Sequence, residues 1–342
     1  MNNIFYKLIS FFLAILVSCA KSPSAEQFLP PQLGAVSVEV QDCYNVVLRG
    51  SAIYEGQDLQ GGLEYGFYYG TNEENMVRIV AKGTAEGFEA SVGGLSFGAG
   101  YQCIPFVKNG ELEQIGSKVE FETQDPFEDA VFRTYILESF DKDGDGGISL
   151  LEAEKVVDIK VDSLGISSLE GIGIFPYLAY LSCVNNNIKV LDLGANMELE
   201  EVTCWENRIG YLNVSGLEKL RILFCWMNNL KEIDISTNVA LEYFGCAQNS
   251  IRTLDLSNNV KMLSLAPNHT LIDSLDLSHC KDLFSLEIQG INSMSEIDVS
   301  CCPKLKLLHA YEAWGLEKVY IHKGQKIEDL RLESGVSLVE KD

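Results

Sequence analysis

Basic residues are scarce in this sequence of 342 residues, which has 26 Lys and Arg against 49 Asp and Glu and a formal net charge of −23. Binding to nucleic acids or to anionic membrane surfaces needs clustered positive charge, so the composition argues against both. Only four histidines occur, none in a zinc-protease spacing, and no glycine-rich loop that could cradle phosphate opens a helix. We therefore do not expect an enzyme. The ten cysteines are too few for a small disulfide-dense scaffold.

Apolar residues, by contrast, are plentiful. Hydrophobic residues make up 46% of the chain and aromatic residues 10%. This composition supplies material for packed cores and excludes wholesale disorder. The length predicts two or three domains rather than one.

The N-terminus has the features of an export signal. Lys7 precedes a largely apolar run of ten residues, Leu8 to Val17. The run is too short to cross a bilayer, because a spanning helix needs about 20 residues. It ends in Leu16-Val17-Ser18-Cys19, which resembles the lipobox of bacterial lipoproteins. The resemblance implies a signal peptide over 1–18, a lipid on Cys19 and a tether over 19–32.

Such a protein is exported and held at the outer membrane or cell surface by its lipid alone. The alternative is an ordinary signal peptide that is followed by an incidental cysteine.

Residues 33–125 alternate between apolar and polar positions in short segments that glycines separate. Seven expected strands in about 90 residues are typical of an antiparallel β-sandwich. These strands cover residues 35–40, 46–53, 65–69, 77–80, 88–92, 101–107 and 119–121.

A short segment of this section carries a family resemblance. Leu95 precedes Tyr101 by six residues, which resembles the corner tyrosine of fibronectin type III domains, and Tyr101 stands two residues before Cys103, as in immunoglobulin domains. The resemblance implies a domain of that type. Cys43 lies near the second expected strand, so it could form a disulfide with Cys103 in an exported protein. The alternative is two buried thiols.

Residues 126–160 change to a helical period and then contain a loop that matches the EF-hand calcium-binding pattern. Oxygen-rich, flexible ligation of this kind suits calcium as the cofactor, and an acidic surface loop is the alternative. We find no second loop, so we expect a structural site at a domain junction rather than a switch. The expected ligands are Asp141, Asp143, Asp145, the carbonyl of Gly147, Ser149 and a bidentate Glu152.

The last section, residues 161–342, is an internal repeat. Leu178 recurs at a period of 21 residues as Leu199, Leu220, Leu241, Met262 and Leu283, and Leu305 follows after 22. The pattern resembles leucine-rich repeats and implies a β-rich solenoid with a C-terminal cap over residues 324–342.

Two further columns recur with this period. Cys183, Cys204, Cys225 and Cys246 are expected to form a column of buried thiols, and Asn186, Asn207, Asn228 and Asn249 a ladder that bonds backbone groups.

Residues between the inward leucines point to the opposite face of each strand. This register exposes several large apolar side chains on neighbouring strands, which is typical of an interaction site. Aromatic rings suit both sugars and protein side chains, and the alternative is that another part of the chain covers them. The expected ligand-binding residues are Tyr180, Trp205, Ile222, Phe224, Trp226 and Tyr243.

The expected fold class is mixed: an all-β sandwich, a short α-helical EF-hand cap and a β-rich leucine-rich repeat solenoid. This arrangement resembles the leucine-rich repeat surface lipoproteins of Gram-negative bacteria and, more distantly, internalin-type proteins. The resemblance implies a monomeric binding protein that captures a protein or carbohydrate ligand, with no nucleic-acid partner. The alternative is a structural subunit of an outer-membrane assembly.

Overall fold

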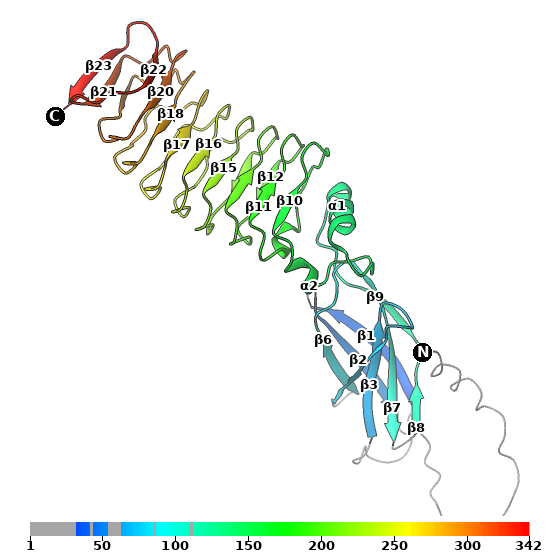
Figure 1. Cartoon of the computed structure of the whole chain (residues 1–342). Helices are drawn as coiled ribbons and strands as arrows, with labels where there is room; N and C mark the ends of the chain where they lie inside the picture. The colour runs from blue at the N-terminus through cyan, green and yellow to red at the C-terminus, as the bar shows by residue number, and fades with distance from the viewer. Residues whose placement is uncertain (1–31, 42–43, 54–62, 85–86, 110–111, 342) are drawn as a thin grey trace, which may run out of the picture.

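The computed structural model describes residues 32–341 except 42–43, 54–62, 85–86 and 110–111. The predicted signal peptide, lipidation site Cys19 and most of the tether lie outside these residues, as does Cys43. The molecule is elongated, with a two-sheet unit at one end, a short helical segment and then a long solenoid (Figure 1). No helix in the described ranges is long and apolar enough to cross a membrane.

The N-terminal unit consists of two antiparallel sheets. The first has the order β1 (Gln32–Val40), β2 (Val46–Ile53), β6 (Phe88–Val92) and β5 (Lys82–Gly83). The second has the order β4 (Val77–Val80), β3 (Leu63–Gly70), β7 (Gly100–Asn109) and β8 (Leu112–Ile115), and β9 (Val119–Glu122) also pairs with β7. Alternate residues of both sheets share one buried core, which includes Leu48, Phe67, Phe88 and Cys103.

Two predicted features of this unit can be located. The hydroxyl of Tyr101 accepts a hydrogen bond from the backbone N–H of Ser96 at 2.9 Å, which is the geometry expected of a corner tyrosine. Cys103 is fully buried as a free cysteine. Because its predicted partner Cys43 lies outside the described residues, the disulfide stays a prediction.

The helical segment contains α1 (Ala130–Phe140) and the single-turn α2 (Leu150–Ala153). Asp129 begins α1 by accepting hydrogen bonds from Val131 N and Phe132 N, which satisfies two otherwise free helix donors. The helix buries Phe132 and Ile136, whereas Val131 is exposed. Position 131 lies one residue before the buried stripe, so it turns away from the core.

The solenoid is built on a parallel sheet of nine strands, each paired in register with the next. Their order follows the sequence (Figure 1), and the repeat spacing places Leu181, Val202, Leu223 and Phe244 side by side in the core. The leucine-rich repeat solenoid is thus confirmed. The strands are β10 (Asp158–Lys160), β11 (Tyr180–Ser182), β13 (Glu201–Thr203), β15 (Ile222–Phe224), β16 (Tyr243–Gly245), β17 (Ser264–Ala266), β18 (Ser285–Glu287), β20 (Leu307–Ala310) and β22 (Asp329–Leu332).

Short elements complete the turns of the solenoid. They are η2 (Ile172–Ile174), the pair β12 (Val190–Asp192) and β14 (Tyr211–Asn213), and the trio β19 (Glu296–Asp298), β21 (Lys318–His322) and β23 (Ser337–Lys341). The C-terminal residues differ from the expected cap. β22 and β23 pair in parallel with β20 and β21, so residues 324–341 add a further turn, since Leu330 and Leu332 pack on the same core.

The asparagine ladder is confirmed. Asn228, for example, donates to the carbonyls of Cys204 at 3.0 Å and Cys225 at 3.1 Å, and accepts from Ile209 N at 2.9 Å. Each asparagine therefore joins its own turn to the preceding one. The same contacts recur at Asn186, Asn207 and Asn249.

The cysteine column (Cys183, Cys204, Cys225 and Cys246) is confirmed as well, because all four residues are fully buried free thiols. Burial raises the pKa of Cys204 to about 12 and the pKa of Cys246 to about 12. These thiols therefore stay protonated at neutral pH and act as small apolar side chains.

A second asparagine column was not anticipated from the sequence. Asn196, Asn238 and Asn259 are completely buried, and each donates from its side-chain amide to two backbone carbonyls. In the sequence these asparagines are 42 and then 21 residues apart, which are multiples of the repeat period. The column is hard to recognise because Leu217 occupies the position between Asn196 and Asn238.

Candidate functional site

The predicted ligand-binding residues lie on the outward face of the nine-stranded sheet. The strand register aligns Tyr180, Glu201, Ile222 and Tyr243 in one row across four strands. Tyr180 and Tyr243 are exposed, while Ile222 is half-buried. The structure thus places all of the predicted residues on one face, although Glu201 separates Tyr180 from the others.

Three rings on this face form what we call the aromatic cluster: Trp205, Phe224 and Trp226. The indole rings of Trp205 and Trp226 are stacked with centroids 5.5 Å apart and an interplanar angle of 21°. Phe224 lies against Trp226 with centroids 5.0 Å apart. Stacking follows from the architecture, since equivalent residues of neighbouring repeats are held about one strand spacing apart.

Gly245 makes room for this cluster. A Cβ atom at that position would lie 3.0 Å from Cε3 of Trp226 and 3.2 Å from Cδ1 of Phe224. A side chain on the neighbouring strand would therefore displace both rings. The sequence contained this signal as a glycine at a strand position, which often marks a close approach.

The rings are half-buried because they cover one another, and the cluster is not covered by the N-terminal sheets. Figure 1 shows these sheets past the N-terminal end of the solenoid, whereas β13 to β16 lie several turns toward its C-terminal end. Within the described residues, the N-terminal sheets therefore do not fold over the aromatic cluster. The stacked faces of Trp205 and Trp226 meet each other, so these two faces are not available to a ligand.

The same face becomes polar toward the C-terminus, which the sequence reasoning did not use. His309 Nε2 lies 2.9 Å from Asp329 Oδ2, and Arg331 donates to Asp329 at 3.0 Å and 3.1 Å. Arg331 and then His309 hold the pKa of Asp329 below its ordinary value. The sheet face is therefore aromatic in its first half and carries a charged network in its second.

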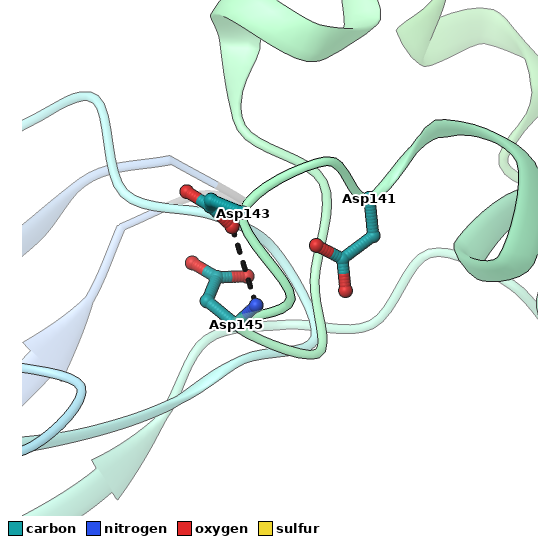
Figure 2. Close-up of side chains that lie close together, drawn as sticks. All are labelled: Asp141, Asp143 and Asp145. Atoms are coloured by element: carbon teal, nitrogen blue, oxygen red, sulfur yellow. Dashed lines mark hydrogen bonds between the residues drawn. The ribbon is translucent and has the colours of Figure 1, made fainter.

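The acidic loop between α1 and α2 is a second candidate site. One carboxylate oxygen from each of Asp141, Asp143 and Asp145 lies within 4.8 Å of the others. Figure 2 shows the three side chains gathered around the loop, with the backbone N–H of Asp145 donating to the carboxylate of Asp143 at 3.2 Å. Gly144 and Gly146 adopt φ angles of 73° and 88°, which are left-handed values that favour glycine and allow the sharp turn.

Electrostatics in this loop oppose bringing the carboxylates together. Burial, and then the charge of Asp145, raises the pKa of Asp143 above its ordinary value. A divalent cation would relieve this repulsion, and carboxylate oxygens are ligands that calcium prefers.

Two other predicted ligands, Ser149 and Glu152, cap the helix α2. Glu152 accepts hydrogen bonds from Lys142 N at 2.6 Å and from Ser149 N at 2.9 Å, and Ser149 accepts from Glu152 N, so the two side chains form the capping box of α2. Burial acts to raise the pKa of Glu152, but hydrogen bonds from Ser149 and Lys142 outweigh it and keep the pKa below its ordinary value. Glu152 is thus held as a carboxylate beside the loop.

The loop is also joined to the N-terminal sheets. Phe97 and Ile148 form an antiparallel bridge, with Phe97 N donating to Ile148 O at 3.2 Å and Ile148 N to Phe97 O at 3.4 Å. Ser96 Oγ donates to Asp145 Oδ2 at 2.7 Å. A Cβ atom at Gly147 would lie 2.4 Å from Phe97 O, so this approach requires glycine. Sequence spacing cannot reveal a contact between segments about 50 residues apart.

No protein-family model matches the sequence, and comparison with curated proteins finds no relative. Three solved structures from Listeria monocytogenes resemble part of the fold. The functional domain of InlJ, which includes a cysteine ladder, is 23% identical with a TM-score of 0.42, and the match covers 57% of this chain and 55% of that one. This chain thus spans about half the length of the InlJ domain.

The other two structures are internalins of strain 4b F2365. InlF is 17% identical with a TM-score of 0.37, and the match covers 58% of this chain and 83% of that one. Internalin C2 is 16% identical with a TM-score of 0.37, covering 48% of this chain and 85% of that one. Likeness at this level says nothing about what this chain binds.

Proposed function

We propose that this chain is an exported, lipid-anchored binding protein that captures a protein ligand on the sheet face of its solenoid. The observation that carries the proposal is the aromatic cluster. Trp205, Phe224 and Trp226 are partly exposed on a ladder of strands that keeps their positions rigid. Large aromatic side chains held in this way dominate the binding energy of many protein interfaces.

Ring geometry favours a protein over a carbohydrate at the aromatic cluster. A sugar ring stacks on an open aromatic face, but Trp205 and Trp226 use facing surfaces on each other. The half-buried rings together with half-buried Ile222 offer apolar contacts of the kind that protein side chains fill. The cluster is the centre of the proposed interface, and exposed Tyr180 and Tyr243 form its rim.

The anchor belongs to the same proposal and rests on the lipobox resemblance at Cys19. A lipid at the N-terminus would attach the two-sheet unit, proposed as a fibronectin type III/immunoglobulin-like spacer. The solenoid extends away from this unit (Figure 1). An elongated arrangement of this kind would hold the aromatic cluster away from the membrane.

We also propose that the acidic loop holds calcium in a structural role. The three aspartates fit an oxygen-liganded cation, and Gly147 and Ser149 follow in the EF-hand spacing. Glu152 would exchange its hydrogen bonds with Lys142 and Ser149 for the ion. Since Ser96 donates to Asp145 and Phe97 pairs with Ile148, order in the loop would be transmitted to the N-terminal sheets.

The experiment that tests ligand capture compares the full chain with its Trp226→Ala variant on an array of purified proteins. We expect each specific interaction to weaken by at least about tenfold. Truncating a central aromatic side chain commonly costs about 2 kcal/mol of binding free energy, and a tenfold loss of affinity corresponds to about 1.4 kcal/mol. Trp314→Ala is the matched control, because Trp314 is 72% exposed and lies outside the aromatic cluster.

Identical binding profiles for the wild type and Trp226→Ala would contradict the proposal. A profile in which Trp314→Ala loses the same interactions would show that general surface stickiness, not the aromatic cluster, causes them. A stoichiometric partner recovered only from the detergent-solubilised envelope would instead favour a subunit of an outer-membrane assembly.

A further inference from the structure

A groove lies at the beginning of strands β16 to β18, beside the aromatic cluster but separate from it. Its volume is about 610 Å³, which is in the range of small-molecule sites. Tyr243 and Phe284 line it together with Ser264, Ser285, Asp282 and Lys304. Apart from Tyr243, none of these residues belongs to a site predicted from the sequence.

The strand register explains why the groove exists. Tyr243, Ser264, Ser285 and Leu307 occupy equivalent positions in four successive strands. Two small side chains therefore lie between two large ones, which leaves a depression whose floor is formed by Ser264 and Ser285. Because parallel pairing holds every strand in register, the depression is a built feature of the sheet.

The aromatic side chains of the groove differ from those of the aromatic cluster. Tyr243 is 37% exposed and Phe284 is 49% exposed. Neither ring stacks on another ring in the described part of the chain. Both rings are therefore partly exposed and free of ring–ring stacking, so a ligand can reach part of each ring. The C–H side of a sugar ring is apolar and carries a partial positive charge, which the negative face of an aromatic ring attracts.

Charges around the groove are already neutralised within the protein. Lys304 Nζ lies 2.6 Å from Asp282 Oδ1, and Lys306 Nζ lies 3.0 Å from Glu328 Oε1. The groove thus has no excess charge to match an ionic ligand. It offers hydroxyls from Ser264 and Ser285, carboxylate acceptors and ammonium donors, which is the polar complement that sugar hydroxyls require.

From these observations we infer that the groove binds a neutral saccharide. Phe284 and Tyr243 would contact the apolar side of the sugar, while Ser264, Asp282 and Lys304 would bond its hydroxyls. This site goes beyond the proposed capture of a protein: the groove does not use the aromatic cluster, and Tyr243 is the one residue that it shares with the rim of the proposed interface. A variant of the aromatic cluster or of Phe284 could therefore lose one site and keep the other.

The test screens the full chain on an array of neutral and acidic oligosaccharides and measures the affinity of each binder by calorimetry. Phe284→Ala removes an open ring, and Ser264→Leu fills the floor while leaving the rings in place. We expect a neutral oligosaccharide to bind and both variants to weaken it by at least about tenfold. Tyr211→Ala is the matched control, since Tyr211 is 56% exposed on β14, outside the nine-stranded sheet.

Thermal unfolding of each variant separates lost binding from lost folding. Trp226→Ala should keep saccharide affinity even where it abolishes protein capture, so failure of one proposal is distinguishable from failure of the other. The inference is wrong if no neutral oligosaccharide binds, or if Phe284→Ala and Ser264→Leu bind as the wild type does. It is also wrong if both variants instead lose binding to peptides displayed on phage, which would assign the groove to a peptide.

Discussion

Replacing Asn228 by alanine should destabilise the solenoid strongly, because this buried side chain satisfies backbone groups of two turns. Its amide donates to Cys204 O, Cys225 O and Trp226 O, and its oxygen accepts from Ile209 N. A buried polar group without a partner costs about 1–3 kcal/mol. All four groups lose a hydrogen bond: the carbonyls of Cys204, Cys225 and Trp226 keep a second donor from Asn207, Asn249 and Glu206. Ile209 N loses the acceptor that Asn228 provides, and water entering the space left by the amide recovers part of the loss.

We therefore expect Asn228→Ala to lower the free energy of unfolding by about 3 kcal/mol. Urea unfolding followed by tryptophan fluorescence measures this change, since Trp205 and Trp226 lie just after the adjacent strands β13 and β15, next to the site. Stacked repeats unfold with nearest-neighbour coupling, so the transitions should be fitted with a repeat model as well as a two-state one.

Asn229→Ala is the matched control for this prediction. Asn229 is the next residue in the chain, is exposed, and makes a single long contact with Arg208 O at 3.4 Å. Its loss should change the stability by less than about 0.5 kcal/mol. Equal and small shifts for both variants would refute the reasoning that the ladder holds the turns together.

Three further predictions follow from other parts of the molecule. Calorimetry should detect one bound calcium per chain, and Asp141→Ala or Glu152→Ala should abolish it; unchanged binding in both variants would exclude the loop. Asp129 caps α1 and accepts hydrogen bonds from Ser167; burial acts to raise the pKa of Asp129, but the hydrogen bonds, first those from Ser167, lower it below 3.8. The stability that Asp129 adds should therefore be present above pH 3.8 and be lost as the pH falls through the lowered pKa. Acid titration of Asp129→Asn should show no such loss. In the folded chain the cysteine column should not react with Ellman's reagent, whereas partly exposed Cys301 should react first among the cysteines in the described part of the chain. Rapid labelling of the column would contradict its burial.

The repeat architecture could be predicted because the same local sequence pattern recurs many times along the chain. Leu178 and its equivalents define the turn length, and an asparagine such as Asn228 follows a buried cysteine at a constant distance. Each turn is a short-range structure that stacks on a copy of itself, so period and residue type suffice to infer its contacts. The further turn formed by residues 324–341 could not be inferred in this way, since their apolar pattern is too short to distinguish a cap from one more turn.

The candidate sites were predictable only in part. The strand register predicted that Trp205, Phe224 and Trp226 lie on one outward face. It did not predict that the rings stack on one another or that Gly245 provides the space for them. Rotamers of neighbouring side chains decide such details, and they depend on packing rather than on spacing. The EF-hand pattern likewise located Asp141, whereas the capping bonds of Glu152 emerged from the fold.

By itself, the sequence determined the order of the sections, the 21-residue turn, the two predicted columns and the outward position of the aromatic residues. These properties depend on residues that are close in the chain or repeated along it. Tertiary structure alone decided the bridge between Phe97 and Ile148, the hydrogen bond from Ser96 to Asp145, and the groove between Tyr243 and Leu307. The reason is physical: these contacts join segments that only folding brings together, and their geometry is set by the volume of side chains on several strands at once.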